Sequence, residues 1–471
     1  MVTLHLDGAI VICDNICEFC RQEGGMVNFR RKAYSQMLDW KNNLADKYAL
    51  LIEGARRVGK THLVTEFVSK EYDSFIFIDF SHKDKVVRDS KKAFTEESDI
   101  NGVLERLQTI HRVSLVPGKS CVVFDEVQRF PIAREAIKQL VKHGKYHYIE
   151  TGSLLGIHEN VKDIVIPSEE HKMKMHPLDF EEFLWALDAE KTADRIRECF
   201  CEKKPLGWLH EGAVKLARQY MVVGGMPQSL EAYCLGDDHR LEACEAAKRE
   251  VLSLYEADIG KYARRYAAKV RAIFRHIPAA LNTREKKFHI ADLDRNARMR
   301  RYENAFFWLS DAMIANVAYN STDPSVGLEM NLDDSLFKCY LLDTGLLLTQ
   351  AMRGSNDVDG RLLRGILYDK LGVNEGMFFE NFVAQALTCR GYDLLFHSRS
   401  NPKVEVDFLF RNGIKVCPIE VKSSGFRVHR SLDWIVDRKP SLLGEKYVVC
   451  TGDLEIVNGI TYLPFYMAHC L

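Results

Sequence analysis

The sequence predicts an α/β protein whose first large domain is a doubly wound parallel sheet. Apolar runs that start at Ala49, Ser74 and Ser120 alternate with segments of helical apolar spacing. Such alternation is typical of βαβ units, in which helices cover both faces of the sheet. A glycine-bounded turn follows the first run, and adjacent carboxylates follow the third. Both features therefore lie at strand ends, where parallel α/β sheets bind their ligands.

The turn after the first strand, Ala49–Ile52, has the spacing G-x-x-x-x-G-K-[ST]. Gly54 and Gly59 let the backbone curl so that successive N–H groups point at one polyphosphate. Lys60 would reach the β- and γ-phosphates, and the Thr61 hydroxyl would hold Mg²⁺. The alternative is a basic turn between a strand and a helix. The predicted nucleotide-binding residues are Gly54, Ala55, Arg56, Arg57, Val58, Gly59, Lys60, Thr61 and His62.

Two carboxylates end the apolar run that starts at Ser120. Asp125 would bind Mg²⁺ directly or through water, and Glu126 would polarise the attacking water as general base. An acidic turn after a core strand is the structural alternative. The next strand, Tyr146–Glu150, is followed by the polar segment Thr151–Ser153. That segment would contact the γ-phosphate or the attacking water, or form a simple ST-turn.

Several motifs in combination resemble a known family. They are GARRVGKT, FDEVQ, YIETGS, IPSEEHKMKMHPLDFEEFLWAL and YMVVGGMPQ. Together they are similar to the P-loop ATPases of the archaeal-type AAA group, whose C-terminal domain of unknown function contains a restriction-endonuclease-like region. The resemblance covers nearly the whole chain from about Met26 onward. It implies ATP as ligand, Mg²⁺ as cofactor and ATPase activity, and it implies no settled biological role.

Three positions in the loop are notable when they are compared with this family. Ala55 stands where many members have proline, a departure of small expected cost. Arg56 and Arg57 match the Arg-Arg that the family often shows. They would add positive charge near the triphosphate or pair with acids on a neighbouring surface.

The composition is that of an ordinary globular protein of 471 residues, with 46% apolar and 28% charged residues. Because the 65 basic and 66 acidic residues nearly cancel, contact with DNA would have to come from local patches. The 13 dispersed cysteines favour reduced thiols in a cytosol. No apolar run approaches the roughly 20 residues that span a bilayer. We therefore expect a cytoplasmic protein without membrane contacts.

Residues 1–25 differ from the rest and are expected to be an N-terminal extension. Cys13, Cys17 and Cys20 have the spacing C-x₃-C-x₂-C, which resembles the iron–sulfur motif of radical enzymes that use S-adenosylmethionine. The C-x₂-C pair would also suit zinc. No second Cys/His pair and no barrel pattern follow, which argues against a metal. Family members typically begin near MVNFRRKAY, so Met26 is a candidate start.

The segments around the phosphate loop are predicted to be mainly helical. Asn28–Asn43 is a basic amphipathic helix, and the charged segment His82–Asp99 is expected to be exposed. Phe180–Leu187 and Cys199–Tyr233 have the spacing of helices that form a small lid. Gly224–Pro227 resembles a family landmark. We expect it near the nucleotide, at a domain hinge or in a plain helix–helix connection.

Residues 271–350 have the element order of a winged helix-turn-helix. Helices over Lys269–Leu281, Ile290–Leu293 and Arg301–Ser310 precede the strand Ile314–Tyr319, and the third helix would be the recognition element. DNA phosphates would be contacted by Arg295, Arg298, Arg300 and Arg301. Winged helices also serve as protein scaffolds, and clustered arginines also suit a solvated face.

A second candidate site lies near the C-terminus. Asn-Gly between the alternating runs Val404–Phe410 and Lys415–Lys422 is a strong hairpin signal. Asp407 lies on the first strand, while Glu420 and Lys422, two residues apart, share a face of the second.

Two carboxylates that bind Mg²⁺ and a lysine that steadies hydroxide are what phosphodiester cleavage requires. The pattern resembles the PD-(D/E)xK nuclease core: Asp407, Glu420 and Lys422 match its motif, and Glu380, on a preceding helix, completes the set. Val406 departs from the proline of the motif. The alternative is an ion-paired hairpin surface.

The predicted domains are an N-terminal extension (1–25), a P-loop AAA ATPase domain (26–200), a helical lid (201–270), a winged-helix-like domain (271–350) and a restriction-endonuclease-like α/β domain (351–471). The first functional hypothesis is a Mg²⁺-dependent ATPase that couples hydrolysis to the C-terminal domains. Its expected partners are DNA, another protein or further copies of the chain. The second hypothesis is a nucleotide-gated binding protein with an inactive C-terminal domain.

Overall fold

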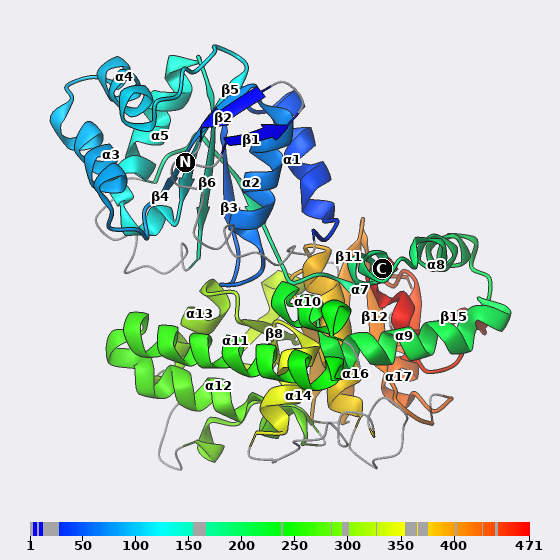
Figure 1. The fold of residues 1–471 in the computed structure, drawn as a ribbon. Helices are drawn as coiled ribbons and strands as arrows, with labels where there is room; N and C mark the ends of the chain where they lie inside the picture. The colour runs from blue at the N-terminus through cyan, green and yellow to red at the C-terminus, as the bar shows by residue number, and fades with distance from the viewer. Residues whose placement is uncertain are drawn as a thin grey trace. The chain divides into compact units, whose positions relative to one another are not determined.

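The computed structural model describes residues 3–6, 9–12, 28–153, 166–236, 239–283, 285–293, 301–325, 327–353, 365, 375–400, 403–425, 427–438 and 441–471. The chain divides into two compact units, Met1–Met175 and His176–Leu471 (Figure 1). The first unit thus ends before residue 200, where the sequence placed the end of the ATPase domain. The predicted boundaries within the second unit stay predictions. Cys13, Cys17 and Cys20 lie outside the described residues.

The first unit contains a parallel sheet with the strand order β4-β5-β6-β3-β7. Its register pairs Asp79 with Asp125 and Phe124 with Glu150, so the carboxyl ends of β4, β5 and β6 meet at one edge. This confirms the predicted parallel α/β sheet. The strands are β3 (Ala49–Glu53), β4 (Ser74–Asp79), β5 (Ser120–Asp125), β6 (His147–Gly152) and β7 (Glu170–Lys174). Near the N-terminus, β1 (Thr3–Leu6) pairs antiparallel with β2 (Ala9–Ile12).

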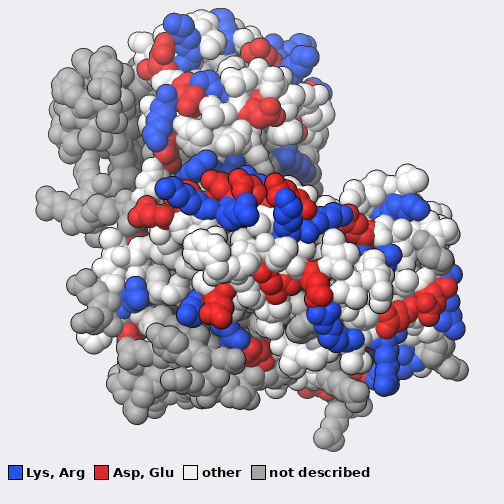
Figure 2. Space-filling model, turned by 90° about the vertical axis from the view of Figure 1, so that its right-hand side faces the viewer, with Lys and Arg blue, Asp and Glu red and all other residues white. Residues whose placement is uncertain are grey.

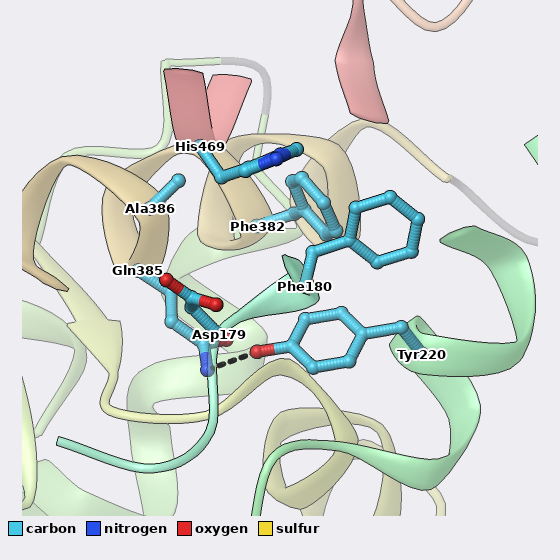
Figure 3. Close-up of a pocket in the computed structure, with 7 residues that line it drawn as sticks. All are labelled: Asp179, Phe180, Tyr220, Phe382, Gln385, Ala386 and His469. Carbon is cyan, nitrogen blue, oxygen red and sulfur yellow. Dashed lines mark hydrogen bonds between the residues drawn. The ribbon is translucent and has the colours of Figure 1, made fainter. Parts of the chain in front are cut away.

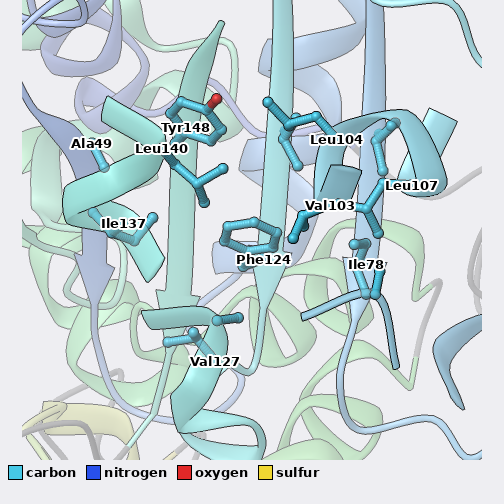
Figure 4. Packing of buried hydrophobic residues seen from close by; sticks show 14 of the residues in the cluster. Ala49, Ile78, Val103, Leu104, Leu107, Phe124, Val127, Ile137, Leu140 and Tyr148 are labelled. Atoms are coloured by element: carbon cyan, nitrogen blue, oxygen red, sulfur yellow. The ribbon is translucent and has the colours of Figure 1, made fainter. Parts of the chain in front are cut away.

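Helices cover both faces of this sheet (Figure 1). On one face, Trp40 of α1 and Tyr72 at the end of α2 pack edge-on against His147 of β6. On the other face, apolar residues of α3, α4 and α5 pack with Phe124 and Tyr148 into a continuous core (Figure 4). The helices are α1 (Lys32–Asn43), α2 (Lys60–Glu71), α3 (Lys85–Glu96), α4 (Ile100–His111) and α5 (Pro131–His143).

Helix α3 adds detail to the expectation that His82–Asp99 is an exposed charged segment, because most positions of the segment are exposed but one face of the helix is not. Asp84 caps the helix, because its side chain accepts a hydrogen bond from the Val87 N–H at 2.8 Å. Val87 and Ala93 are buried and join the core. The many charged residues around this narrow apolar face hide it in the sequence.

The second unit contains a mixed sheet with the order β14-β15-β13-β12-β11-β10-β8-β9. β11 and β12 form the predicted hairpin, with Gly413 in the left-handed region at φ 60°. β8 pairs in parallel with β10, so strands of the predicted winged-helix and nuclease-like regions belong to one sheet. The strands are β8 (Ala315–Ser321), β9 (Leu332–Leu341), β10 (Leu395–Arg399), β11 (Val404–Asn412), β12 (Lys415–Val421), β13 (Lys446–Cys450), β14 (Glu455–Val457) and β15 (Ile460–Pro464).

Helices pack around this second sheet. The helix order of the predicted winged-helix region, α12, a short 3-10 turn (Ile290–Asp292) and α13, matches the expectation, but a winged helix remains a prediction. Of the four arginines expected to contact DNA, only Arg301 lies within the described residues, and it is exposed. The helices are α7 (Phe180–Ala186), α8 (Glu190–Glu202), α9 (His210–Val223), α10 (Pro227–Leu235), α11 (Arg240–Tyr262), α12 (Ala267–Leu281), α13 (Glu303–Asp311), α14 (Thr344–Ala351), α16 (Gly376–Cys389) and α17 (Arg430–Arg438).

The Gly224–Pro227 turn lies at a buried polar junction of the second unit. The Asp343 carboxylate accepts hydrogen bonds from the Gly225 N–H at 2.6 Å and from the Gln385 side chain at 3.3 Å. A Cβ on Gly225 would lie 1.9 Å from the carbonyl oxygen of Leu178, so only glycine fits. Figure 3 shows the other side of this junction, where the Gln385 amide donates to the Tyr220 hydroxyl at 2.8 Å beside a small cavity. The turn therefore connects α9 and α10 and anchors them to α14 and α16.

The surface is mixed in charge. On the face shown in Figure 2, basic and acidic side chains are interspersed, as the nearly balanced composition leads one to expect. Of the helices in the described residues, none combines the length and apolarity that a membrane crossing needs. The cysteines that the structure describes are free thiols.

Candidate functional site

The predicted phosphate loop joins β3 to α2 in the first unit. Gly59 adopts the left-handed conformation at φ 98° and immediately precedes α2. A Cβ on Gly54 would lie 2.4 Å from the carbonyl oxygen of Met175, so this position also requires glycine. Since no side chain caps α2, its first N–H groups remain available to an anion.

Lys60 is buried inside this loop. Its ammonium donates to the carbonyl oxygens of Gly54 and Ala55, at 2.9 Å each. Burial lowers the pKa of Lys60, while the nearby carboxylates of Glu126 and Asp125 act to raise it. Its hydrogen bonds go to neutral groups, so its charge can still be used by a phosphate.

Asp125 lies between two threonine hydroxyls at the carboxyl edge of the sheet. Thr61 donates to its Oδ2 at 3.0 Å, and Thr151 donates to its Oδ1. Burial raises the pKa of Asp125 to about 6, aided by Asp79 and Glu126 and opposed by the hydroxyl bonds. A carboxylate in this environment favours a bound cation, because the cation removes the cost of its buried charge. Thr61 and Asp125, the predicted metal ligands, are thus brought together.

Glu126 follows directly in an unusual backbone conformation. Its φ is 52°, in the left-handed region that residues other than glycine seldom adopt. Its Oε2 accepts a hydrogen bond of 2.7 Å from the Gln128 amide, and that amide nitrogen also lies 3.5 Å from the Ser153 hydroxyl. Glu126 is half-buried and on the same edge as Asp125. Our sequence analysis missed the role of Gln128, although it stands within FDEVQ.

The loop is supported by the segment that precedes α1, which was not predicted. Arg31 donates to the carbonyl oxygen of Val58 at 3.0 Å, and Asn28 contacts the ring of His62 at 3.2 Å. Within the loop, Arg57 has a φ of 69°. Only the basic character of Asn28–Asn43 hinted that this helix serves the loop.

The C-terminal candidate residues also come together. Glu420, near the end of β12, and Lys422, directly after that strand, form an ion pair of 2.7 Å, as their spacing predicts. The second oxygen of Glu420 accepts from the Leu432 N–H in the first turn of α17 at 3.3 Å. Asp407 of β11 accepts from the Val421 N–H at 2.8 Å. Burial raises the pKa of Glu420, and the neighbouring charge of Asp407 raises it further, whereas Lys422 lowers it.

Two unpredicted lysines contact this cluster. Lys338 of β9 has a fully buried side chain, and its ammonium lies 3.0 Å from Glu405, 3.3 Å from Asp407 and 3.6 Å from Glu380. Lys286 donates to the other oxygen of Glu380. In strand order β9 is three steps from β11, or roughly 14 Å on a flat sheet. The long side chain of Lys338 therefore reaches across several strands of the sheet, a contact that a sequence pattern does not show.

These lysines set the electrostatics of the cluster. Burial acts to lower the pKa of Lys338, but the carboxylates around it outweigh burial and hold that pKa well above its ordinary value. Burial acts to raise the pKa of Asp407, and Lys338 and Lys286 outweigh it and lower that pKa. Among the described residues, no group of three or more Asp, Glu, His or Cys side chains is arranged to hold a metal ion.

Comparisons with known proteins match parts of the chain to families. A family model described as an AAA domain matches residues 46–184. The match contains the phosphate loop, Asp125 and the parallel sheet, so this part of the chain is similar to AAA-type P-loop ATPases. Two further models, domains of unknown function DUF8612 and DUF4143, match residues 214–357 and 375–467. The AAA-type and unknown-function parts of the resemblance are thereby confirmed, while its archaeal and nuclease-like parts stay predictions.

The comparisons with curated proteins and with solved structures assign no further family or fold. No curated protein matches the chain. Among solved structures, the chain is similar to one titled "Structure of Drosophila ORC bound to DNA", with 13% identity over 73% of this chain and 96% of that chain. At a TM-score of 0.27 the likeness is too weak to define a fold.

Proposed function

We propose that the protein is a Mg²⁺-dependent ATPase whose catalytic residues all lie in the first unit. The observation that carries this proposal is the convergence of Lys60, Thr61, Asp125 and Glu126 at the carboxyl edge of one parallel sheet. Only glycine fits at positions 54 and 59. The charge of Lys60 remains available to an anion, and Asp125 favours a bound cation. The residues present therefore fit ATP and Mg²⁺.

The roles follow from this geometry. The loop amides and Lys60 bind the phosphates, and Thr61 with Asp125 would hold the metal. Mg²⁺, when bound, would neutralise phosphate charge and orient the terminal phosphate for attack. Glu126 takes a proton from the attacking water, and Thr151 keeps Asp125 oriented.

Two substitutions test these roles. Lys60→Ala should abolish ATP binding, because the phosphates lose their buried cation, whereas Glu126→Gln should keep binding and lose turnover. Lys83→Ala and Glu105→Gln, at exposed positions of the same unit, are the matched controls. Binding is measured by calorimetry and turnover by phosphate release. Hydrolysis at the parent rate in both site variants would show that the assigned roles are wrong.

The finer proposal concerns what the ATPase drives. We propose that hydrolysis repositions the second unit on a partner, with DNA phosphates as the first candidate because the predicted winged-helix region is rich in arginine. ATP turnover with and without duplex DNA, over a range of salt concentrations, tests this. Stimulation that weakens with salt supports a DNA partner, and turnover independent of DNA favours a protein partner or self-assembly.

For the C-terminal cluster, the geometry supports an inactive domain that binds a partner better than it supports nuclease activity. Glu380, Asp407, Glu420 and Lys422 lie in one cluster, but Lys338 and Lys286 already neutralise its carboxylates. A divalent ion would have to enter against these fixed charges. Supercoiled plasmid with Mg²⁺ or Mn²⁺ separates the two functions. Cleavage that is lost in Glu420→Ala would establish a nuclease; intact plasmid under every nucleotide condition would support the binding role.

A further inference from the structure

The side chain of Gln128 makes contacts beyond its own turn. It lies in the short 3-10 turn Val127–Arg129, directly after the strand that ends in Asp125. Its amide nitrogen donates to Glu126 at 2.7 Å and reaches the Ser153 hydroxyl at 3.5 Å. It therefore links the proposed general base to the end of β6, the neighbouring strand of the sheet.

The orientation of this amide is determined by charge. An ionised carboxylate only accepts hydrogen bonds, so the NH₂ group of Gln128 must face Glu126 and the carbonyl oxygen must face elsewhere. That oxygen, Oε1, is buried and has no hydrogen-bond partner among the described residues. An unsatisfied buried acceptor lowers stability, because it loses its hydration without gaining a partner. Such a cost at a catalytic edge indicates a donor that arrives during function.

The backbone adds a second, independent observation. Glu126 holds a left-handed φ of 52° immediately before the turn. Strained conformations of this kind lower stability and concentrate at functional sites. Here the strained residue is the one whose side chain Gln128 binds.

We propose that Gln128 is the residue that positions the attacking water in ATP hydrolysis. The inference rests on the proposed ATPase function. Its amide NH₂ holds the Glu126 carboxylate in place, and its Oε1 accepts one hydrogen of the water. The water oxygen bonds to the γ-phosphorus as the bond to the β–γ bridging oxygen breaks. Glu126 takes the other proton, and ADP leaves with the electron pair of the broken bond.

Gln128→Ala removes both the donor and the acceptor. We expect kcat to fall on the order of 10²-fold, as for a misplaced reactant, while KM and the Kd for ATP stay within about twofold of the parent because the Gln128 amide donates to Glu126 and Ser153 rather than to the phosphate loop. Gln36→Ala, at an exposed position of α1, is the matched control. Ser153→Ala should have a smaller effect, since its contact is long.

Gln128→Glu supplies a readout that a merely structural role would not change. The introduced carboxyl keeps the acceptor but donates to Glu126 only when protonated. Its kcat should therefore rise relative to that of the parent as pH falls from 8 to 6. This profile also decides the matter if Gln128→Ala proves unstable in a thermal melt.

The outcomes separate this inference from the ATPase assignment. Parent-like kcat in Gln128→Ala, together with loss of ATP binding in Lys60→Ala, overturns the role of Gln128 and leaves the ATPase intact. A raised Kd with unchanged kcat assigns Gln128 to ground-state binding and also overturns it. A parent protein that does not hydrolyse ATP overturns both.

Discussion

Lys60 and Lys338 are both buried lysines next to carboxylates, yet their partners differ. Lys60 donates to two backbone carbonyls, and burial lowers its pKa. Lys338 is within ion-pair distance of three carboxylates, and they raise its pKa well above the ordinary value. The charge of Lys60 therefore remains available to a ligand, whereas the charge of Lys338 is already neutralised by carboxylates of the protein. The comparison teaches that residue types alone do not define a site: the partners of a buried cation decide whether it binds ligand or supports structure.

The largest effect is expected at Lys338. Lys338→Met leaves Glu380 and Asp407 buried with fewer positive partners, which should lower the free energy of unfolding by about 3–5 kcal/mol. Denaturant titration of Lys338→Met measures this loss of free energy, and the exposed Lys215→Met on α9 is the control. Parent-like stability would show that the ion-pair cluster is not structural.

Lys60 should behave in the opposite way. Lys60→Met should change the stability of the ligand-free protein by only about 1 kcal/mol, since only bonds to carbonyls are lost. It should remove the stabilisation by Mg·ATP, which is about 2.7 kcal/mol for the parent at a ligand concentration of 100 times Kd. Melting curves of the parent and of Lys60→Met, each with and without Mg·ATP, measure both effects. A normal shift in the variant would contradict a phosphate-binding role.

Asp125 allows the first site to be tested through the pH dependence of stability. Because its folded-state pKa is raised to about 6, this carboxyl stabilises the ligand-free protein fully below about pH 4. That contribution is lost as pH rises through 6, by about 3 kcal/mol in total. Asp125→Asn should flatten this part of the stability profile. Denaturation midpoints between pH 4 and 7 test it, and equal slopes in parent and variant would be inconsistent with a buried, proton-binding Asp125.

The same pKa affects ligand binding. Mg²⁺ has to replace the proton on Asp125, so affinity for Mg·ATP should fall about tenfold for each pH unit below 6. Calorimetry at pH 5 and pH 7.5 measures the difference. Constant affinity would place the metal on other residues.

The smallest effect is expected at Lys286, which is partly exposed at 17% of its side-chain surface. Lys286→Ala should cost about 1 kcal/mol or less, and it should increase Mn²⁺ affinity at the cluster because one fixed charge is removed. Lys403→Ala, which breaks a more exposed ion pair with Glu285, is the control. Equal Mn²⁺ binding in both variants would argue against Lys286 as a competing cation.

Much of the first site was predictable because its residues are close in sequence or lie at strand ends. The glycine spacing defined the loop, and Asp125 and Glu126 followed from their place after an apolar strand. The C-terminal hairpin followed from Asn-Gly and alternation in the same way. Gln128 stood in a motif whose geometry the spacing did not reveal, and α3 was hidden by its charges.

By itself, the sequence determined the order of strand, loop and helix, the presence of the β11–β12 hairpin and the residue types at both sites, because these depend on local backbone preferences and side-chain periodicity. Only the tertiary structure decided that Thr151 bonds to Asp125 and that Lys338 reaches Asp407. Those contacts join residues that lie far apart along the chain. They arise from strand order, which depends on the packing of the whole unit.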